Sequence, residues 1–233
     1  MANSEVHVFS PSAMHSSLDE LAARHREQSG TAVSLAFETA PAFRKRLDAG
    51  QKADVLIAPP PLMDELVATG KARAENIFEL GRVGVGVVVR EGAPLPDISD
   101  VEAFKRSLLD AESIVYNRAS SGMYVEKLIA NLGVAHALAP KTKRYHDAQG
   151  AFTHLRSGSG YEIGFGGLTE IVRWRDKGLL LVGALPSDIQ NFTVYLAALA
   201  TDGPNAAGGH AFLEFLRTPA AQAILTSNGV VLR

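Results

Sequence analysis

The chain contains no cysteine, so disulfide bonds and thiolate metal sites are excluded, and the redox state of its compartment stays open. No apolar run reaches the ~18 residues of a membrane-spanning helix, so we expect no stable membrane insertion. The formal net charge of −2 argues against nucleic acid as a partner, because that partner requires a basic face. The 233 residues, 46% of them hydrophobic, suffice for one large domain or two small ones.

Several motifs of cofactor and metal sites are also missing. The glycines of VGVGVVV and GFGG lack the G-x-G-x-x-G spacing of a dinucleotide site with its ribose-binding acid. The seven histidines show neither H-x-x-x-H nor H-E-x-x-H spacing, and no G-x-S-x-G nucleophile elbow occurs. The sequence therefore predicts no metal and no cofactor.

The first residues, MANSEVHVFS, contain neither a basic n-region nor an apolar h-region of a secretory signal. Two interpretations stay open. Either the protein is cytoplasmic, or a leader was removed and replaced by a start codon.

The most informative positive feature is a set of strand-like runs that lead directly into helices with short, small or polar first turns. A helix N-terminus carries unpaired N–H groups and a partial positive charge, so it attracts anions. Several such N-termini converging on one cleft would bind an anionic ligand with few charged side chains. The strand-like runs are Val6–Ser10, Val33–Glu38, Ser113–Asn117 and Lys141–Asp147.

Strands alternate with helices along the whole chain, which predicts an α/β protein with parallel sheets and helices on both faces. Further strands are expected at 53–58, 83–90, 161–166, 179–185 and 192–199. Two helices, at about 208–216 and 220–227, are expected to close the chain.

One stretch, LDAGQKADVLIAPPPLMDELVATGKA, resembles the run IEAG-x-x-ADL-[FV]-[IV]-SA-[DN]-x-x-W-M-[DN] of the periplasmic molybdate-binding protein family. Further similarity lies in VGVGVVV, ASSGMYVEKLIANLGV and AQGAFTHLRSGSGYEIGFG. The tail HAFLEFLRTPAAQAILTSNGVV is similar to the family's AFxxFLxSPEAQxIFxxYGF. The resemblance follows the same order over nearly the whole chain.

The resemblance implies a type II periplasmic-binding-protein fold, in which two α/β lobes hold a ligand in the cleft at their hinge. Lobe I would comprise residues 1–82 plus 193–233, and lobe II residues 83–192. It further implies a periplasmic monomer that binds a small anionic ligand and delivers it to the permease of an ABC-type transporter.

The positions that bind the oxyanion in that family have changed in this chain. The first-turn serine corresponds to Ala13, with serines shifted to Ser10 and Ser12, and the second serine corresponds to Ala40, beside Thr39. A tyrosine of the family is replaced by Gly167. The positions expected to offer backbone donors remain, and they are Ser121, Gly122 and Ala148. Loss of three hydroxyls argues against a tight oxyanion cage, since a hydrogen bond to a charged group contributes about 1.5–3 kcal/mol.

Arg118 precedes the helix of ASSGMYVEKL and would suit a ligand carboxylate, because its guanidinium can form two parallel hydrogen bonds. The resemblance thus shifts toward relatives that bind organic polycarboxylates, among them the aconitate isomerases, whose LVGPLP-x-E-[IL]-Q is similar to LVGALPSDIQ here. We expect a solute-binding protein for an organic di- or tricarboxylate. An isomerase, a molybdate or tungstate binder, and the effector-binding part of a regulator remain alternatives.

Simpler roles are also open for these residues. Ser10, Ser12 and Thr39 could only cap helices, and Arg118 could pair with a surface carboxylate. Asp147 is expected to be an N-cap. An isomerase would need a general base, and the candidates are His15, Glu38 and His146, although a glutamate such as Glu38 at a strand end is usually exposed.

Overall fold

The computed structural model describes residues 5–232, and the chain divides into two compact units. Unit 1 comprises Met1–Val83 and Thr193–Arg233, and unit 2 comprises Gly84–Phe192. The chain enters unit 2 within strand β4 (Phe78–Arg90) and leaves it at the start of β9 (Phe192–Leu199). None of the helices in residues 5–232 combines the length and the apolar character that a membrane crossing requires.

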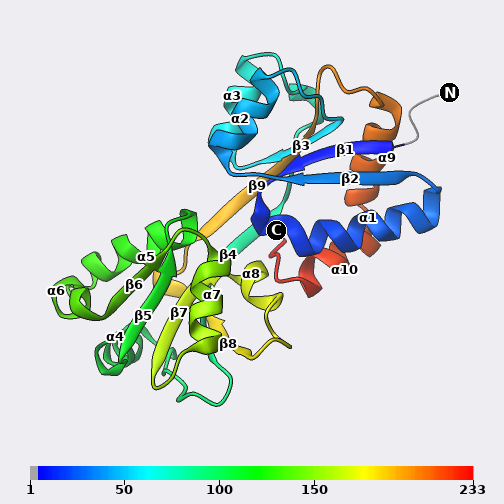
Figure 1. Cartoon of the computed structure of the whole chain (residues 1–233). Coiled ribbons are helices and arrows are strands. Elements are labelled where there is room, and N and C mark those ends of the chain that lie inside the picture. Colours follow the sequence, from blue (N-terminus) through cyan, green and yellow to red (C-terminus); the bar gives the residue numbers. More distant parts are fainter. Residues whose placement is uncertain (1–4, 233) are drawn as a thin grey trace. The chain divides into compact units, whose positions relative to one another are not determined.

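The sheet of unit 1 has the strand order β2 (Ala32–Phe37), β1 (Glu5–Ser10), β3 (Val55–Ala58) and β9. Strand β1 runs parallel to both of its neighbours, whereas β9 runs antiparallel to β3 (Figure 1). The middle strands are buried on both faces, as parallel strands covered by helices usually are.

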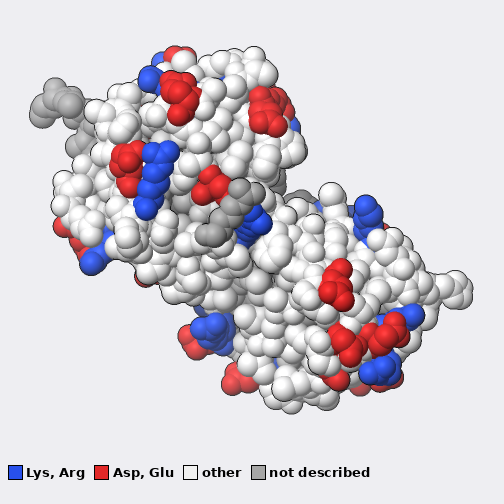
Figure 2. Space-filling view, turned by 180° about the vertical axis from the view of Figure 1, so that it is seen from behind, with Lys and Arg blue, Asp and Glu red and all other residues white. Residues whose placement is uncertain are grey.

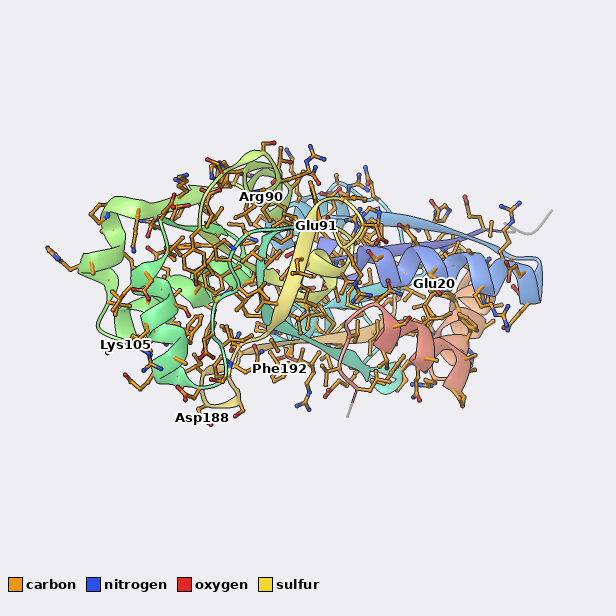
Figure 3. All side chains as sticks on the ribbon, turned by 90° about the horizontal axis from the view of Figure 1, so that it is seen from below. Glu20, Arg90, Glu91, Lys105, Asp188 and Phe192 are labelled. Atoms are coloured by element: carbon orange, nitrogen blue, oxygen red, sulfur yellow. The ribbon has the colours of Figure 1, made fainter. Side chains whose placement is uncertain are left out.

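Helices cover both faces of this sheet. They are α1 (His15–Ser29), preceded by the 3-10 turn η1 (Ser12–Met14), α2 (Ala40–Asp48), α3 (Pro60–Ala68), α9 (Ala206–Leu216) and α10 (Pro219–Ser227). Strand β3 shows the two-residue period directly, since Val55 and Ile57 join the core under α1, α9 and α10, while Leu56 and Ala58 join the core under α2 and α3. Figure 3 labels Glu20 on α1, which accepts a hydrogen bond from Asn228 after α10 at 2.8 Å.

A buried carboxylate ties the chain ends of unit 1 together. Asp54 is only 1% exposed, and its Oδ2 accepts a hydrogen bond from the N–H of His7 at 2.8 Å. Its Oδ1 accepts from the N–H of Asn205 at 2.6 Å, and Asn205 in turn caps α9 through Gly208. The Ala53-Asp54 step of the sequence motif is therefore structural, because removing the carboxylate would leave two partly buried N–H donors without partners.

The sheet of unit 2 has the order β8 (Leu179–Ala184), β4, β7 (Glu162–Gly167), β5 (Ser113–Asn117) and β6 (Thr142–Tyr145). Strand β5 is parallel to β6 and β7, and β4 is antiparallel to β7 and β8. The helices are α4 (Val101–Asp110), α5 (Ser120–Asn131), α6 (Ala135–Leu138), α7 (Ala148–Ser157) and α8 (Leu168–Val172). Short 3-10 turns lie at Ala74–Asn76 in unit 1 and at Ala139–Lys141 and Ser187–Ile189 in unit 2.

The sheets are mixed, so the prediction of parallel sheets is wrong for β4 and β9. A right-handed strand–helix–strand connection enforces parallel pairing only between strands that it links within one sheet. Strands β4 and β9 instead carry the chain from one unit to the other, and each runs against a neighbour in the unit that it enters.

Charged side chains of both signs are interspersed on the face shown in Figure 2. No broad surface of a single sign is visible there, in keeping with the small net charge of the chain.

Candidate functional site

In unit 1 the parallel strands β1, β2 and β3 end at one edge of the sheet, and at that edge the helices α1, α2 and α3 begin. Ligands of α/β proteins bind outside the carboxyl ends of such strands. Within the described residues, no side chain caps the N-terminus of η1, α1, α2 or α3. Helix α3 begins with Pro60 and Pro61, which have no N–H, and the N–H groups of its next two residues donate to the carbonyl of Pro59. Unpaired N–H groups for water or an anion are therefore expected only at the starts of η1 and α2.

The serines of the first turn lie at the end of β1. Ser10 is fully buried, and its Oγ donates a hydrogen bond to the carbonyl of Pro11 at 3.2 Å. Ser12 is exposed and Ala13 is half-buried, both in η1. The alternative that Ser10 and Ser12 cap the helix is wrong, because neither hydroxyl accepts a hydrogen bond from the first turn.

The second turn of unit 1 follows β2. Thr39 stands directly before α2 and is exposed, but its hydroxyl makes no cap bond, so the cap interpretation is wrong here as well. Ala40 is half-buried as the first residue of α2. Glu38 is not the exposed glutamate that the sequence suggested. It is half-buried, and its Oε1 lies 2.8 Å from Nε of Arg46.

The guanidinium of Arg46, which pairs with Glu38, also lies 5.6 Å from the ring centre of Phe9. Glu38 is therefore occupied by a cation. This ion pair suits a structural role for Glu38 better than proton transfer.

His15 begins α1, where its Nε2 lies 3.1 Å from Oδ2 of Asp19. Its ring stacks on Phe37 at the end of β2, with 4.0 Å between the ring centres. The structure thus brings His15 to the same edge as the serines.

In unit 2 the carboxyl ends of β5, β6 and β7 also share one edge, because the three strands are parallel. Asn117, Tyr145 and Gly167 are the last residues of these strands. The turns that follow contain the candidates Arg118, Ser121, Gly122, His146 and Ala148. One edge of unit 2 therefore gathers all of its candidate residues.

Arg118 is exposed at the start of the turn before α5. Within residues 5–232, its guanidinium forms no ion pair and no side-chain hydrogen bond. The alternative that Arg118 pairs with a surface carboxylate is therefore wrong for this structure. Its five N–H donors are available to a ligand.

Asn117 organises the N-terminus of α5, and the sequence analysis missed it. The side chain is 1% exposed, and its Oδ1 accepts from the N–H groups of Ala119 at 2.9 Å and Gly122 at 3.3 Å. Its Nδ2 donates to Oγ of Ser121 at 3.4 Å. A Cβ at Gly122 would lie 1.8 Å from the carbonyl oxygen of Asn117.

Gly122 is consequently a packing residue, and the expectation that it offers a ligand donor is wrong, because Asn117 already accepts from its N–H. Ser121 is half-buried in the first turn. The only sequence signal for Asn117 was a polar residue at the end of an apolar strand.

Asp147 caps α7, as predicted, by accepting a hydrogen bond from the N–H of Gly150 at 2.8 Å. That bond is the main reason why the pKa of Asp147 lies below its ordinary value. Ala148 is buried behind the cap, and His146 is 93% exposed, with Nδ1 3.4 Å from Oδ2 of Asp147. An ionised carboxylate at this N-terminus competes with an external anion.

Gly167 closes β7 and is buried. Its N–H donates to Oε2 of Glu170 at 3.2 Å, and burial raises the pKa of that carboxyl group. Glu170 was also missed, although a glutamate three residues into a helix that follows a strand matches half of a capping box. In residues 5–232, no three or more His, Asp and Glu side chains lie together in a way that could hold a metal ion.

The sequence matches a family of known proteins over almost its whole length. The model of the family described as "Bacterial extracellular solute-binding protein" covers residues 6–231. The chain belongs to this family. The type II α/β architecture expected from the sequence is confirmed by the solved structures that share it.

One curated relative is an aconitate isomerase from a Pseudomonas species, 26% identical over 229 residues, which is 96% of this chain and 86% of the relative. Among solved structures, the periplasmic molybdate-binding protein of Azotobacter vinelandii superposes with a TM-score of 0.78 at 19% identity, over 98% of this chain and 99% of that one. PEB3 bound to L-phospholactate superposes with a TM-score of 0.72 at 14% identity, over 98% and 100% of the chains. At these identities the superpositions show the fold.

Proposed function

We propose that this solute-binding protein captures a small organic anion with two or three carboxylates. The observation that carries the proposal is Arg118, an exposed guanidinium without a protein partner at the carboxyl edge of unit 2. A planar guanidinium recognises a carboxylate through two parallel hydrogen bonds. The uncapped start of α2 is, by itself, a further place in unit 1 where an anionic group can be held.

A bare tetrahedral oxyanion fits the same residues less well. Ala13 and Ala40 have no hydroxyl to donate, and Gly167 leaves space where the resembling family has a tyrosine. Before α7, the carboxylate of the N-cap residue Asp147 would repel a compact dianion. An anion whose charges are several ångströms apart can place one carboxylate at Arg118 while keeping the other away from Asp147.

The proposal extends to where the ligand goes. We propose that the loaded protein docks on the permease of an ABC-type transporter outside the cytoplasm. Support comes from the family, whose description is extracellular and solute-binding. The similarity to PEB3 bound to L-phospholactate supports an organic anion as the ligand class.

A thermal-shift screen tests the proposal. Citrate, tricarballylate, trans-aconitate, succinate, molybdate, tungstate and sulfate are compared at matched concentrations. A ligand at about 100 times its dissociation constant stabilises the folded state by about 2.7 kcal/mol, which is readily detected. We expect the largest shift from a di- or tricarboxylate, and a larger shift with molybdate or tungstate would overturn the proposal in favour of that alternative.

A second candidate function is isomerisation of a tricarboxylate, supported by the name of the curated relative. The reaction needs a base within ~3 Å of a C–H bond. Of the bases considered from the sequence, Glu38 is held by Arg46, His146 is almost fully exposed, and His15 lies beside Asp19.

Proton NMR of trans-aconitate with the protein in deuterium oxide separates the two functions. A binding protein leaves the isomer ratio and the C–H signals unchanged over hours. Appearance of the cis isomer, with deuterium entering the methylene group, would establish the isomerase.

A further inference from the structure

A cluster of four polar side chains lies in unit 2 away from the carboxyl edge of its sheet. Ser113 and Glu162 are the first residues of the adjacent parallel strands β5 and β7. Lys143 lies on β6, and His154 lies on helix α7, which packs against all three strands (Figure 1). The candidate site described above uses none of these residues, so the cluster needs an explanation of its own.

Glu162 is the fixed member of this cluster. Its side chain is 8% exposed, and its Oε1 accepts a hydrogen bond from Oγ of Ser113 at 2.6 Å. A Cβ at Gly158 would lie 2.0 Å from Oε2, so the neighbouring backbone packs closely against the carboxylate. Burial alone would raise the pKa of Glu162, but hydrogen bonds from Lys143, Ser113 and His154 lower it below its ordinary value. Glu162 is therefore an ionised group that cannot move toward new partners.

Two nitrogen atoms compete for Oε1 of Glu162. Nζ of Lys143 lies 2.9 Å from this oxygen, and Nε2 of His154 lies 3.0 Å from it. The two nitrogens are 3.1 Å apart, so the three atoms form a closed triangle. A neutral His154 can accept a hydrogen bond from the lysine ammonium only if its ring proton is on Nδ1. A protonated His154 is a donor at both ring nitrogens, so it must donate to Oε1 instead.

The protonated state of His154 disturbs the triangle. Two cations would then lie 3.1 Å apart on one carboxylate oxygen, where they repel each other. The side chain of Lys143 is 44% exposed, and its four-carbon stem is flexible. The side chain of His154 is only 23% exposed, and its ring stacks on Tyr145 with 5.4 Å between the ring centres. The lysine is therefore the group that leaves.

The other charged groups near helix α7 are directed elsewhere. The helix packs against β5, β6, β7 and β8. Arg144 on β6 pairs with Glu126, and Tyr116 on β5 belongs to the core on the opposite face of the sheet from α7. Strand β8 contains no ionisable side chain. On α7 itself, the guanidinium of Arg156 lies over the ring of Trp174. The bonds of His154 thus depend mainly on its two partners in the triangle.

We propose that His154 is a proton-operated switch that exchanges the partner of Glu162. Neutral His154 accepts a hydrogen bond from Lys143 and leaves the lysine paired with Glu162. Protonated His154 takes Glu162 for itself and releases the ammonium of Lys143 into solvent. The inference does not depend on the proposed function, because the cluster lies outside the candidate site.

The exchange has a directed consequence. Glu162 keeps a cationic partner in both states, so the change concerns the surface of unit 2 more than the stability of its fold. Strand β6 is the outermost strand of this sheet. Acid therefore frees a cation at the sheet edge, where an external anionic group could pair with it.

The first test is NMR of the labelled protein between pH 4.5 and pH 8.5. Nitrogen-15 shifts of the imidazole distinguish the two neutral tautomers from the protonated ring, and we expect neutral His154 to carry its proton on Nδ1. Carbon-13 relaxation measures the mobility of the Cε methylene of Lys143. This methylene should be restricted while His154 is neutral, and it should become as mobile as that of Lys127, an exposed lysine of α5, as His154 is protonated.

Three variants sharpen the test. His154→Gln keeps an acceptor beside Lys143 but cannot be protonated, so Lys143 should stay restricted at every pH. Lys143→Met removes the competing cation, so neutral His154 should move its proton to Nε2 and donate to Glu162. His136→Gln is the matched control at an exposed histidine of α6, and it should behave like the wild type. Circular dichroism confirms that each variant is folded.

Two results would overturn the switch. Neutral His154 with its proton on Nε2 in the wild type would mean that it already donates to Glu162 before it is protonated. A Lys143 side chain whose mobility stays constant while His154 titrates would mean that no partner is exchanged.

Discussion

The carboxyl edges of the two units are built in opposite ways. In unit 1 the helices α1, α2 and α3 begin without side-chain caps, and the glutamate at that edge, Glu38, is paired with Arg46. In unit 2 the turns are filled by their own polar side chains, since Asn117 holds the start of α5 and Asp147 caps α7. Unit 1 therefore offers backbone donors, whereas unit 2 offers the side chain of Arg118.

This difference suggests a division of labour in ligand recognition. Backbone N–H groups at helix N-termini bind many kinds of anion, because the partial positive charge there attracts any negative group. A guanidinium places directional donors in one plane, and so it selects among anions. Specificity is expected to reside mainly in unit 2, and the following experiments test the comparison.

The largest expected effect is on ligand affinity at Arg118. Arg118→Ala should weaken polycarboxylate binding by at least about thirtyfold, because truncating one side of a buried charge pair costs about 2–5 kcal/mol. Arg118→Lys should restore only part of the loss, since an ammonium cannot form two parallel bonds. Calorimetric titration measures both variants.

Arg106→Ala is the control for Arg118, because Arg106 is an exposed arginine on α4 of the same unit. It should bind like the wild type. Equal affinity of the Arg118 variants and the wild type would mean that Arg118 does not reach the ligand and that the helix ends bind it alone.

The next effect is on stability, at the two fully buried polar residues that end β1 and β5. Asn117→Ala leaves the N–H groups of Ala119 and Gly122 without their acceptor and should cost about 1–3 kcal/mol in the free energy of unfolding. Ser10→Ala removes one long bond to Pro11 and should cost about 1 kcal/mol or less. Urea denaturation compares the free energies of unfolding of the two variants. A larger loss for Ser10→Ala than for Asn117→Ala would contradict this order of effects.

A smaller effect separates a capped helix from an uncapped one. Asp147→Ala should lower the free energy of unfolding by about 1 kcal/mol, the usual value of an N-cap bond. Thr39→Ala should change it by less than about 0.5 kcal/mol, because Thr39 makes no cap bond. The two variants control each other in urea denaturation, and equal losses would show that α2 is capped in solution.

The smallest effect concerns acid stability, which should also differ between the units. His25 in unit 1 is 4% exposed, lies 5.1 Å from the ring centres of Phe212 and Phe215, and has no partner for Nε2 within the described residues. Burial lowers its pKa below 6.5. The unfolded chain then binds more protons, so stability is full above pH 6.5 and falls as the pH drops toward the folded pKa.

Unit 2 should respond at lower pH. The pKa values of Asp147 and Glu162 are lowered, so the stability that they contribute is present above their ordinary values and is lost only as the pH falls through the lowered ones. Hydrogen–deuterium exchange at pH 5.5 and pH 7.5, with each rate divided by the intrinsic rate at that pH, should show lower protection in peptides of unit 1 at the lower pH. His25→Phe should abolish that difference, and its persistence would mean that another group is responsible.

Much of the fold could be predicted because it depends on local signals. Runs such as Val33–Phe37 and Phe192–Leu199 are apolar and end at small or polar residues, and helices begin where the sequence places them. The orientations of β4 and β9 could not be predicted from alternation, since they depend on where the chain changes units.

The site was less predictable, because the contacts of its side chains depend on how the chain packs and not on local sequence. Arg118 stood out as a cation before a helix, and Asp147 as a cap. The pairing of Glu38 with Arg46, and the acceptance of the Gly122 N–H by Asn117, follow from packing that no spacing rule encodes. Glu170 was partly readable, because its distance from Gly167 matches a capping box.

The contact between Asn117 and Gly122 has a consequence for how this protein can change its ligand. Any side chain at Gly122 would overlap the carbonyl of residue 117, so position 122 is closed to substitution, and the side chain of Asn117 holds the start of α5. Between them lie Arg118, Ala119 and Ser120, all exposed, and the half-buried Ser121. The four residues between Asn117 and Gly122 can therefore change without disturbing β5 or α5. New anion preferences could evolve at these positions, or be selected from a library that varies their four codons.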